Sequence, residues 1–120
     1  MMRRVVAGLI FAFSWIASGI AGPAEEQHFI RSLAFASMIE GWCPLLTIDD
    51  EAKHAYMRSI GITEADLING RLMVPYFDSL IEFQHRWGNS HVAPPVACRV
   101  GEEKFGPQGT LWPRLLKPAQ

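Results

Sequence analysis

The sequence EGWCPLL, residues 40–46, contains one of the chain's two cysteines, and the other lies in PPVACRVGEEKFG, residues 94–106. Nearly all of the strongly patterned sequence lies between Cys43 and Cys98 or directly beside them. A disulfide between them would join the first helical segment to the last substantial one. Because such a link closes a long loop, it would stabilise the fold by about 4 kcal/mol on a chain-entropy model.

The first 21 residues have the three parts of a secretory signal peptide. Residues 1–4 are a short basic start, residues 5–20 are almost wholly apolar, and Gly19 and Ala21 are the small residues of a cleavage site. The apolar run is shorter than the span of about 20 residues that crosses a membrane. We therefore predict a signal peptide over residues 1–21 and a periplasmic or secreted protein without a stable membrane anchor. The alternative is an uncleaved anchor.

Cleavage after Ala21 would leave residues 22–120 as a single helical domain. The chain has 11 Lys and Arg against 12 Asp and Glu, and the loss of Arg3 and Arg4 takes the net charge to −3 with His neutral. This weak acidity argues against nucleic-acid binding, which needs a basic patch. Two cysteines in an exported chain predict a disulfide. The alternative, two free thiols, would require an activating neighbour that the sequence does not show.

Helical periodicity predicts an all-α fold, a compact bundle of four to five helices closed by one disulfide. Phe29, Leu33 and Ala36 recur at helical spacing in a first segment that begins near Glu25 and ends near Gly41. In SIGITEADL, Gly61 can end a helix in the left-handed conformation, and Thr63 can cap the next one with Asp66 reinforcing the cap. The segment TEADLING is acidic, which favours a plain corner over a DNA-binding helix-turn-helix.

Residues 64–87 carry apolar residues around much of a helix, and such a helix is usually buried. We therefore expect this segment to lie at the centre, clamped by the disulfide. Gly70 and Pro75 would weaken it, so it is either one kinked helix or two, and we favour a break or sharp kink there. The last major helix should begin near Pro94 or Pro95. Residues 117–120 read as a tail, and nothing alternates long enough to predict a sheet.

No motif predicts chemistry. The histidines His28, His54, His85 and His91 include one E-x-x-H pair, with Glu82, whereas a zinc site needs three or four ligands. No nucleophile-elbow, phosphate-loop, dinucleotide or zinc-protease motif is present. We predict no metal, no cofactor and no enzymatic activity, with a small enzyme as the less favoured alternative.

Trp42 and Trp112 are the candidate partner-binding residues, because tryptophan is enriched at interfaces and a small domain cannot hide every one. The alternative is that both pack as ordinary core. The positions of Trp42, Cys43, Pro94 or Pro95, Ala97, Cys98 and Phe105 resemble those of small single-disulfide helical periplasmic proteins of the HdeA acid-stress chaperone type. That resemblance implies a helical fold closed by one disulfide.

The sequence therefore predicts a small exported binding protein, with a stress or chaperone-like role that depends on apolar surface. The alternative is an inhibitor or immunity-type binder of another exported protein. A protein partner of unknown identity fits either role.

Overall fold

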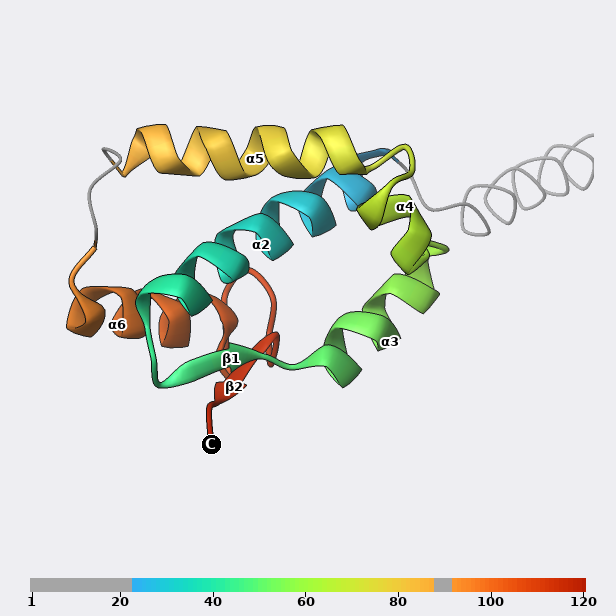
Figure 1. Cartoon of the computed structure of the whole chain (residues 1–120). Coiled ribbons are helices and arrows are strands. Elements are labelled where there is room, and N and C mark those ends of the chain that lie inside the picture. Colours follow the sequence, from blue (N-terminus) through green and yellow to red (C-terminus); the bar gives the residue numbers. More distant parts are fainter. Residues whose placement is uncertain (1–22, 88–91) are drawn as a thin grey trace, which may run out of the picture.

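The computed structural model describes residues 23–87 and 92–120, so the predicted signal peptide and His91 lie outside the described residues. Within them, five helices and two short strands follow one another along the chain (Figure 1). They are α2 (Pro23–Trp42), β1 (Leu46–Ile48), α3 (Asp50–Ile60), α4 (Glu64–Ile68), α5 (Met73–Arg86), α6 (Pro94–Phe105) and β2 (Leu116–Pro118). The predicted all-α class, helix number and disulfide are confirmed.

Helix α2 is the central element of the fold. It contacts α5, α6 and β1, and in Figure 1 it runs between α5 and α6. Its apolar residues are buried nearly all round rather than along one stripe, namely Phe29, Ile30, Leu33, Ala34, Phe35, Ala36 and Ile39. The helix ends at Trp42, directly before Cys43, as the sequence predicts.

The corner between α3 and α4 is built from caps that the sequence predicts. At the far end of α3 from this corner, Asp49 accepts a hydrogen bond from the backbone N–H of Ala52, a cap that is not among those predicted above. Gly61 ends that helix at φ 76°, in the left-handed region that favours glycine. Thr63 and Asp66 then form a reciprocal capping box at the start of α4. These local bonds fix where one helix stops and the next begins.

The expected interruption near Gly70 and Pro75 is a complete break between α4 and α5. A Cβ on Gly70 would lie 2.7 Å from the Cα of Asp66 and 2.8 Å from the carbonyl oxygen of Ala65. Only glycine fits this tight turn. Pro75 is the third residue of α5, where a missing N–H costs no helical hydrogen bond.

The expectation that residues 64–87 form the buried centre is wrong. In α5 only Ser79 and Phe83 are buried, and Val74, Phe77 and Ile81 are exposed. The central position belongs to α2, because α2 is covered by elements on several sides whereas α5 packs on α2 alone over most of its length. An apolar sequence thus shows that a helix can be buried. Whether that helix is buried depends on the elements that pack around it.

The structure also contains a two-stranded antiparallel sheet that the sequence does not predict. Leu46 of β1 lies opposite Pro118 of β2, and Ile48 lies opposite Leu116. The backbone N–H of Asp49 donates to the carbonyl of Leu115 at 2.8 Å and extends the pairing. Residues 117 and 118, expected in a tail, therefore belong to a strand.

Candidate functional site

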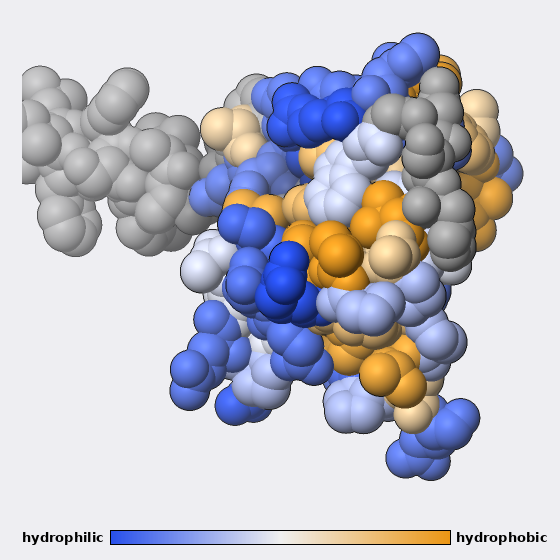
Figure 2. All heavy atoms as spheres, turned by 90° about the vertical axis from the view of Figure 1, so that its left-hand side faces the viewer, coloured by the Kyte–Doolittle hydropathy of each residue, from blue (hydrophilic) through white to orange (hydrophobic). Residues whose placement is uncertain are grey.

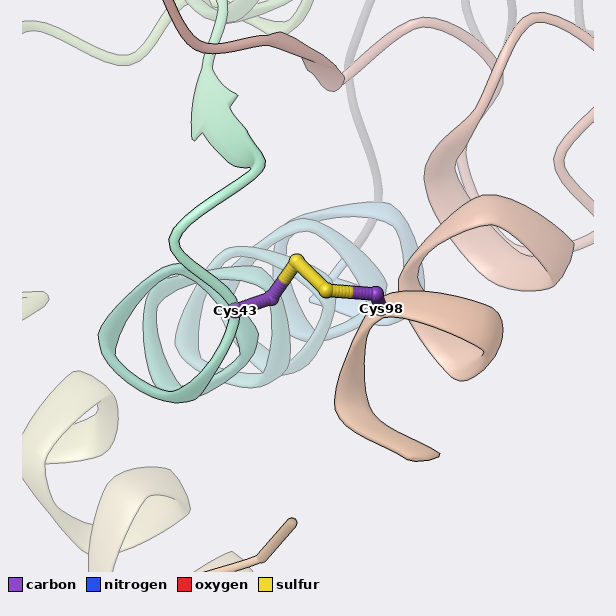
Figure 3. The surroundings of a disulfide bond; sticks show 2 residues. All are labelled: Cys43 and Cys98. Carbon is purple, nitrogen blue, oxygen red and sulfur yellow. A yellow bond between two sulfur atoms is a disulfide. The ribbon is translucent and has the colours of Figure 1, made fainter. Parts of the chain in front are cut away.

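The disulfide ties the end of the central helix to α6. Figure 3 shows Cys43, just past the last turn of α2, and Cys98, on α6, pointing toward one another. Their Cα atoms lie 5.1 Å apart, and Cys43 is fully buried. The predicted bond is therefore present, and it holds together α2 and α6 rather than clamping the α4–α5 segment.

The two candidate tryptophans lie in different environments. Trp112 is only 5% exposed and its ring packs against Phe29, at 4.9 Å between centroids, and Tyr56, at 3.7 Å. Its expected exposure is wrong, because these aromatic residues and α2 enclose it. Trp42 is half-buried and packs against Trp87, with ring centroids 5.6 Å apart and the ring planes tilted by 31°. The structure does not bring the pair together as one surface.

The histidines are spread over the molecule. His28 bonds the carbonyl oxygen of Leu111 at 3.1 Å, and His54 bonds Glu64 at 2.6 Å. Glu82, the partner of His85 in the E-x-x-H pair, bonds Arg31 of α2. Among residues 23–87 and 92–120, no group of three or more His, Cys, Asp or Glu side chains is placed to hold a metal ion.

A row of exposed apolar side chains follows α4 and α5. Val74, Phe77 and Ile81 are 60%, 53% and 51% exposed and recur at helical spacing on α5, and Ile68 of α4 is 66% exposed. These four residues are called the α4–α5 apolar surface below. Large apolar side chains that cluster outside the core are typical of binding surfaces.

A pocket of about 350 Å³ opens at one edge of this surface, between α2, α3, α4 and α5. Ile68 and Phe77 line it together with Leu33 and Leu67. It is large enough for one bulky apolar side chain or a small ligand. The α4–α5 apolar surface therefore includes a hollow as well as an exposed stripe.

Polar side chains also border the pocket. The Ser37 and Tyr76 hydroxyls lie 2.9 Å apart, which satisfies both across the α2–α5 contact. The Lys53 ammonium lies 3.0 Å from the Glu64 carboxylate, so a cation and an anion sit side by side at the rim. The pocket therefore combines apolar walls with a small polar edge.

Carboxylates connect α2 to the α4–α5 region. Arg71, in the α4–α5 connection, donates two hydrogen bonds to Glu26 of α2, at 3.0 and 2.6 Å. Farther along, Arg31 of α2 pairs with Glu82 of α5. A cavity of about 440 Å³ lies in this region between the two helices. The packing of α5 on α2 thus combines a few buried apolar side chains with ion pairs that need ionised carboxylates.

Three carboxylates in and near these contacts, Glu26, Glu64 and Asp66, have lowered pKa values. The hydrogen bonds from Arg71 hold the pKa of Glu26 below its ordinary value of 4.5. Partial burial raises the pKa of Glu64, but the hydrogen bonds and charges of Lys53 and His54 outweigh it and lower the pKa overall. The backbone N–H of Thr63 lowers the pKa of Asp66 in the capping box. All three groups therefore stabilise the fold when they are charged.

A second apolar area lies at the disulfide end of the molecule. Leu45 follows Cys43 by two residues and Val96 precedes Cys98 by two, so the disulfide brings their segments together, and they are 68% and 38% exposed. Figure 2, which shows the left-hand side of Figure 1, has apolar atoms grouped in the middle of a largely hydrophilic face.

Sequence reasoning missed the α4–α5 apolar surface because it assigned these side chains to the core. The sequence does contain a sign of this surface. Val74, Phe77 and Ile81 form a helical stripe separate from the one that contains Tyr76 and Phe83. In the part of the chain that the structure describes, no helix is long and apolar enough to cross a membrane. Comparison of the chain with protein-family models, curated proteins and solved structures finds no match.

Proposed function

We propose that the protein is an exported, stress-responsive binding protein that holds apolar segments of unfolded proteins on its α4–α5 apolar surface. The single observation that carries this proposal is the exposed stripe of Val74, Phe77 and Ile81 on α5. A helix that presents large apolar groups at this spacing can contact a complementary apolar segment along its length. The pocket beside Phe77 offers room for one bulky side chain of that segment.

Acid is the stress that the surrounding charges favour. Glu26 and Glu64 are charged and bonded at neutral pH, and each has a lowered pKa in the folded state. Their contribution to stability is present above the ordinary value of 4.5 and is lost as the pH falls through the lowered folded pKa. Below about pH 4.5 the contacts of α4 and α5 with α2 and α3 therefore weaken, which would uncover apolar residues beneath them.

The test is suppression of aggregation by the mature protein, with malate dehydrogenase as the model client, at pH 7 and at pH 3. The test variant replaces Val74, Phe77 and Ile81 by glutamine. The matched control replaces Leu45, Val96 and Leu111, three other exposed apolar residues, in the same way. Circular dichroism checks that both variants fold.

We expect wild type and the control to suppress aggregation, more strongly at pH 3, and the α5 variant to have lost most of this activity. Binding of a hydrophobic dye should rise below about pH 4.5 in the same proteins. Equal suppression by the two variants, or no change in either readout on acidification, would rule the proposal out.

The alternative, an inhibitor of another exported protein, would use aromatic residues near the disulfide. Of the two candidates, Trp112 is buried and only Trp42 is partly accessible. The observations therefore favour the α4–α5 apolar surface.

A further inference from the structure

A separate pocket of about 270 Å³ lies where α2, α5 and the end of α6 come together. Four basic side chains line it, His28 and Arg31 from α2, Arg86 from α5 and Lys104 from α6, and no acidic residue does. Yet residues 22–120 carry a net charge of −3 with His neutral. Even with His28 counted as neutral, the three cations Arg31, Arg86 and Lys104 around one hollow are thus opposite in sign to the charge of the domain.

The wall of this pocket is aromatic. The Arg31 and Arg86 guanidinium carbons lie 5.4 and 5.8 Å from the centroid of the Phe83 ring, and Phe35 and Leu111 complete the apolar wall. Guanidinium groups over an aromatic face are held in place by the ring quadrupole. Two of the cations are therefore partly positioned before any ligand arrives.

One of these cations already has an anionic partner. Arg31 pairs with Glu82, which lines the neighbouring cavity between α2 and α5 rather than this pocket. No ion pair joins Arg86 or Lys104 to a carboxylate within residues 23–87 and 92–120. His28 donates from Nε2 to the carbonyl oxygen of Leu111, because a carbonyl can only accept. The pocket therefore keeps positive charge available to a ligand.

From these observations we infer that the pocket binds a small organic anion, a carboxylate or phosphate attached to a flat apolar body. Arg86 and Lys104 would hold the anionic oxygens, since guanidinium and ammonium groups are the strongest protein donors to them. The apolar body would lie along Phe35, Phe83 and Leu111. The volume fits a single aromatic ring with its acidic group. This site is distinct from the α4–α5 apolar surface and does not depend on it.

The experiment is NMR titration of the mature wild-type protein with benzoate and phenyl phosphate. Acetate and inorganic phosphate supply the charge without the ring, and benzyl alcohol supplies the ring without the charge. We expect saturable shifts of backbone amides near Arg31, Phe83 and Lys104 with benzoate or phenyl phosphate. Affinities at least about tenfold weaker are expected for the three partial probes.

Matched variants test the two cations that would hold the anionic oxygens. Arg86→Gln and Lys104→Gln should each weaken binding about tenfold or more. Arg99→Gln and Lys117→Gln remove the same charges at exposed positions outside the pocket and should leave the affinity within about twofold of wild type.

Three results would overturn the inference: no saturable shifts with either aromatic anion, equal affinity for acetate and benzoate, or equal losses in the pocket and control variants. The last would indicate attraction by net charge alone. Because no client protein is present in this titration, its failure leaves the proposed chaperone-like function unaffected.

Discussion

Arg71 spans from the α4–α5 connection to Glu26 near the start of α2, and two of its nitrogens bond the two carboxylate oxygens. This pair holds the start of α5 against α2, just after the turn at Gly70 that separates α4 from α5. It joins segments that are far apart in sequence, so it depends on the tertiary fold. The pKa of Glu26 is lowered and that of Arg71 is raised by the same contact.

The Glu26–Arg71 pair should make stability depend on pH. Glu26→Gln should lower the urea midpoint at pH 7 and have a smaller effect at pH 3, because the contribution of the charged pair is lost progressively as the pH falls from the ordinary value of 4.5 through the lowered folded pKa. Glu25→Gln is the matched control, because Glu25 lies in the same first turn of α2 and is exposed. Any effect of the helix dipole is shared by both variants. An equal decrease in midpoint for Glu26→Gln at the two pH values would contradict this role.

Loss of the disulfide should destabilise the protein strongly. Reduction of the bond between Cys43 and Cys98, which are 55 residues apart, should cost about 4 kcal/mol of unfolding free energy. For a domain of this size that corresponds to a fall in Tm of roughly 15–30 °C. Calorimetry measures the effect by comparing the oxidised wild type, the reduced wild type and the Cys43→Ala and Cys98→Ala double variant, which has neither the bond nor the thiols. The same Tm in all three would show that the bond is not structural.

Two glycines in helices should respond in opposite directions to alanine. A Cβ on Gly101 of α6 would lie 2.7 Å from Cδ1 of Leu46 and 2.8 Å from Cγ2 of Ile39. We expect Gly101→Ala to destabilise by about 1 kcal/mol, because overpacking costs roughly 1–3 kcal/mol and exceeds the gain in helix propensity. Gly41→Ala in α2 meets nothing within 4 Å and should stabilise by up to about 1 kcal/mol. Urea denaturation compares the unfolding free energies of the two variants. A stabilised Gly101→Ala variant would mean that α2, α6 and β1 are packed less tightly around Gly101 than these distances indicate.

Trp112 should behave as a core residue and not as a binding residue. Trp112→Ala should cost about 3–5 kcal/mol, because it removes a buried ring between Phe29 and Tyr56. Leu111→Ala, at the exposed neighbouring position, should cost less than about 1 kcal/mol. Chemical denaturation monitored by far-UV circular dichroism is the measurement. Similar small losses for both would place Trp112 at the surface and restore it as a partner-binding candidate.

The parts of the fold that local chemistry controls could be predicted from the sequence. Gly61, Thr63 and Asp66 set helix boundaries through bonds to residues within one turn. Pro75 and Gly70 likewise mark the break before α5, because their effects on the backbone do not depend on distant residues. The disulfide could be predicted because Cys43 and Cys98 are the only two cysteines and residues 1–21 predict export.

The parts that depend on distant neighbours could not be predicted. Helices α2 and α5 are both rich in apolar residues, and the packing of α6 and β1 on α2 decides which is enclosed. Strands β1 and β2 have three residues each, too few for an alternating pattern. The cationic pocket combines side chains from α2, α5 and α6, and nothing in their sequence spacing indicates that they meet.

The pairing of β1 with β2 has a consequence for the order of assembly. Strand β1 begins at Leu46, soon after α2 ends at Trp42, whereas its partner strand β2 ends at Pro118. Trp112, Leu115 and Leu116 are buried in the core and also lie in this segment, and Trp112 packs against Phe29 of α2. A chain that emerges from a ribosome N-terminus first therefore cannot complete its core until residues 112–118 are free.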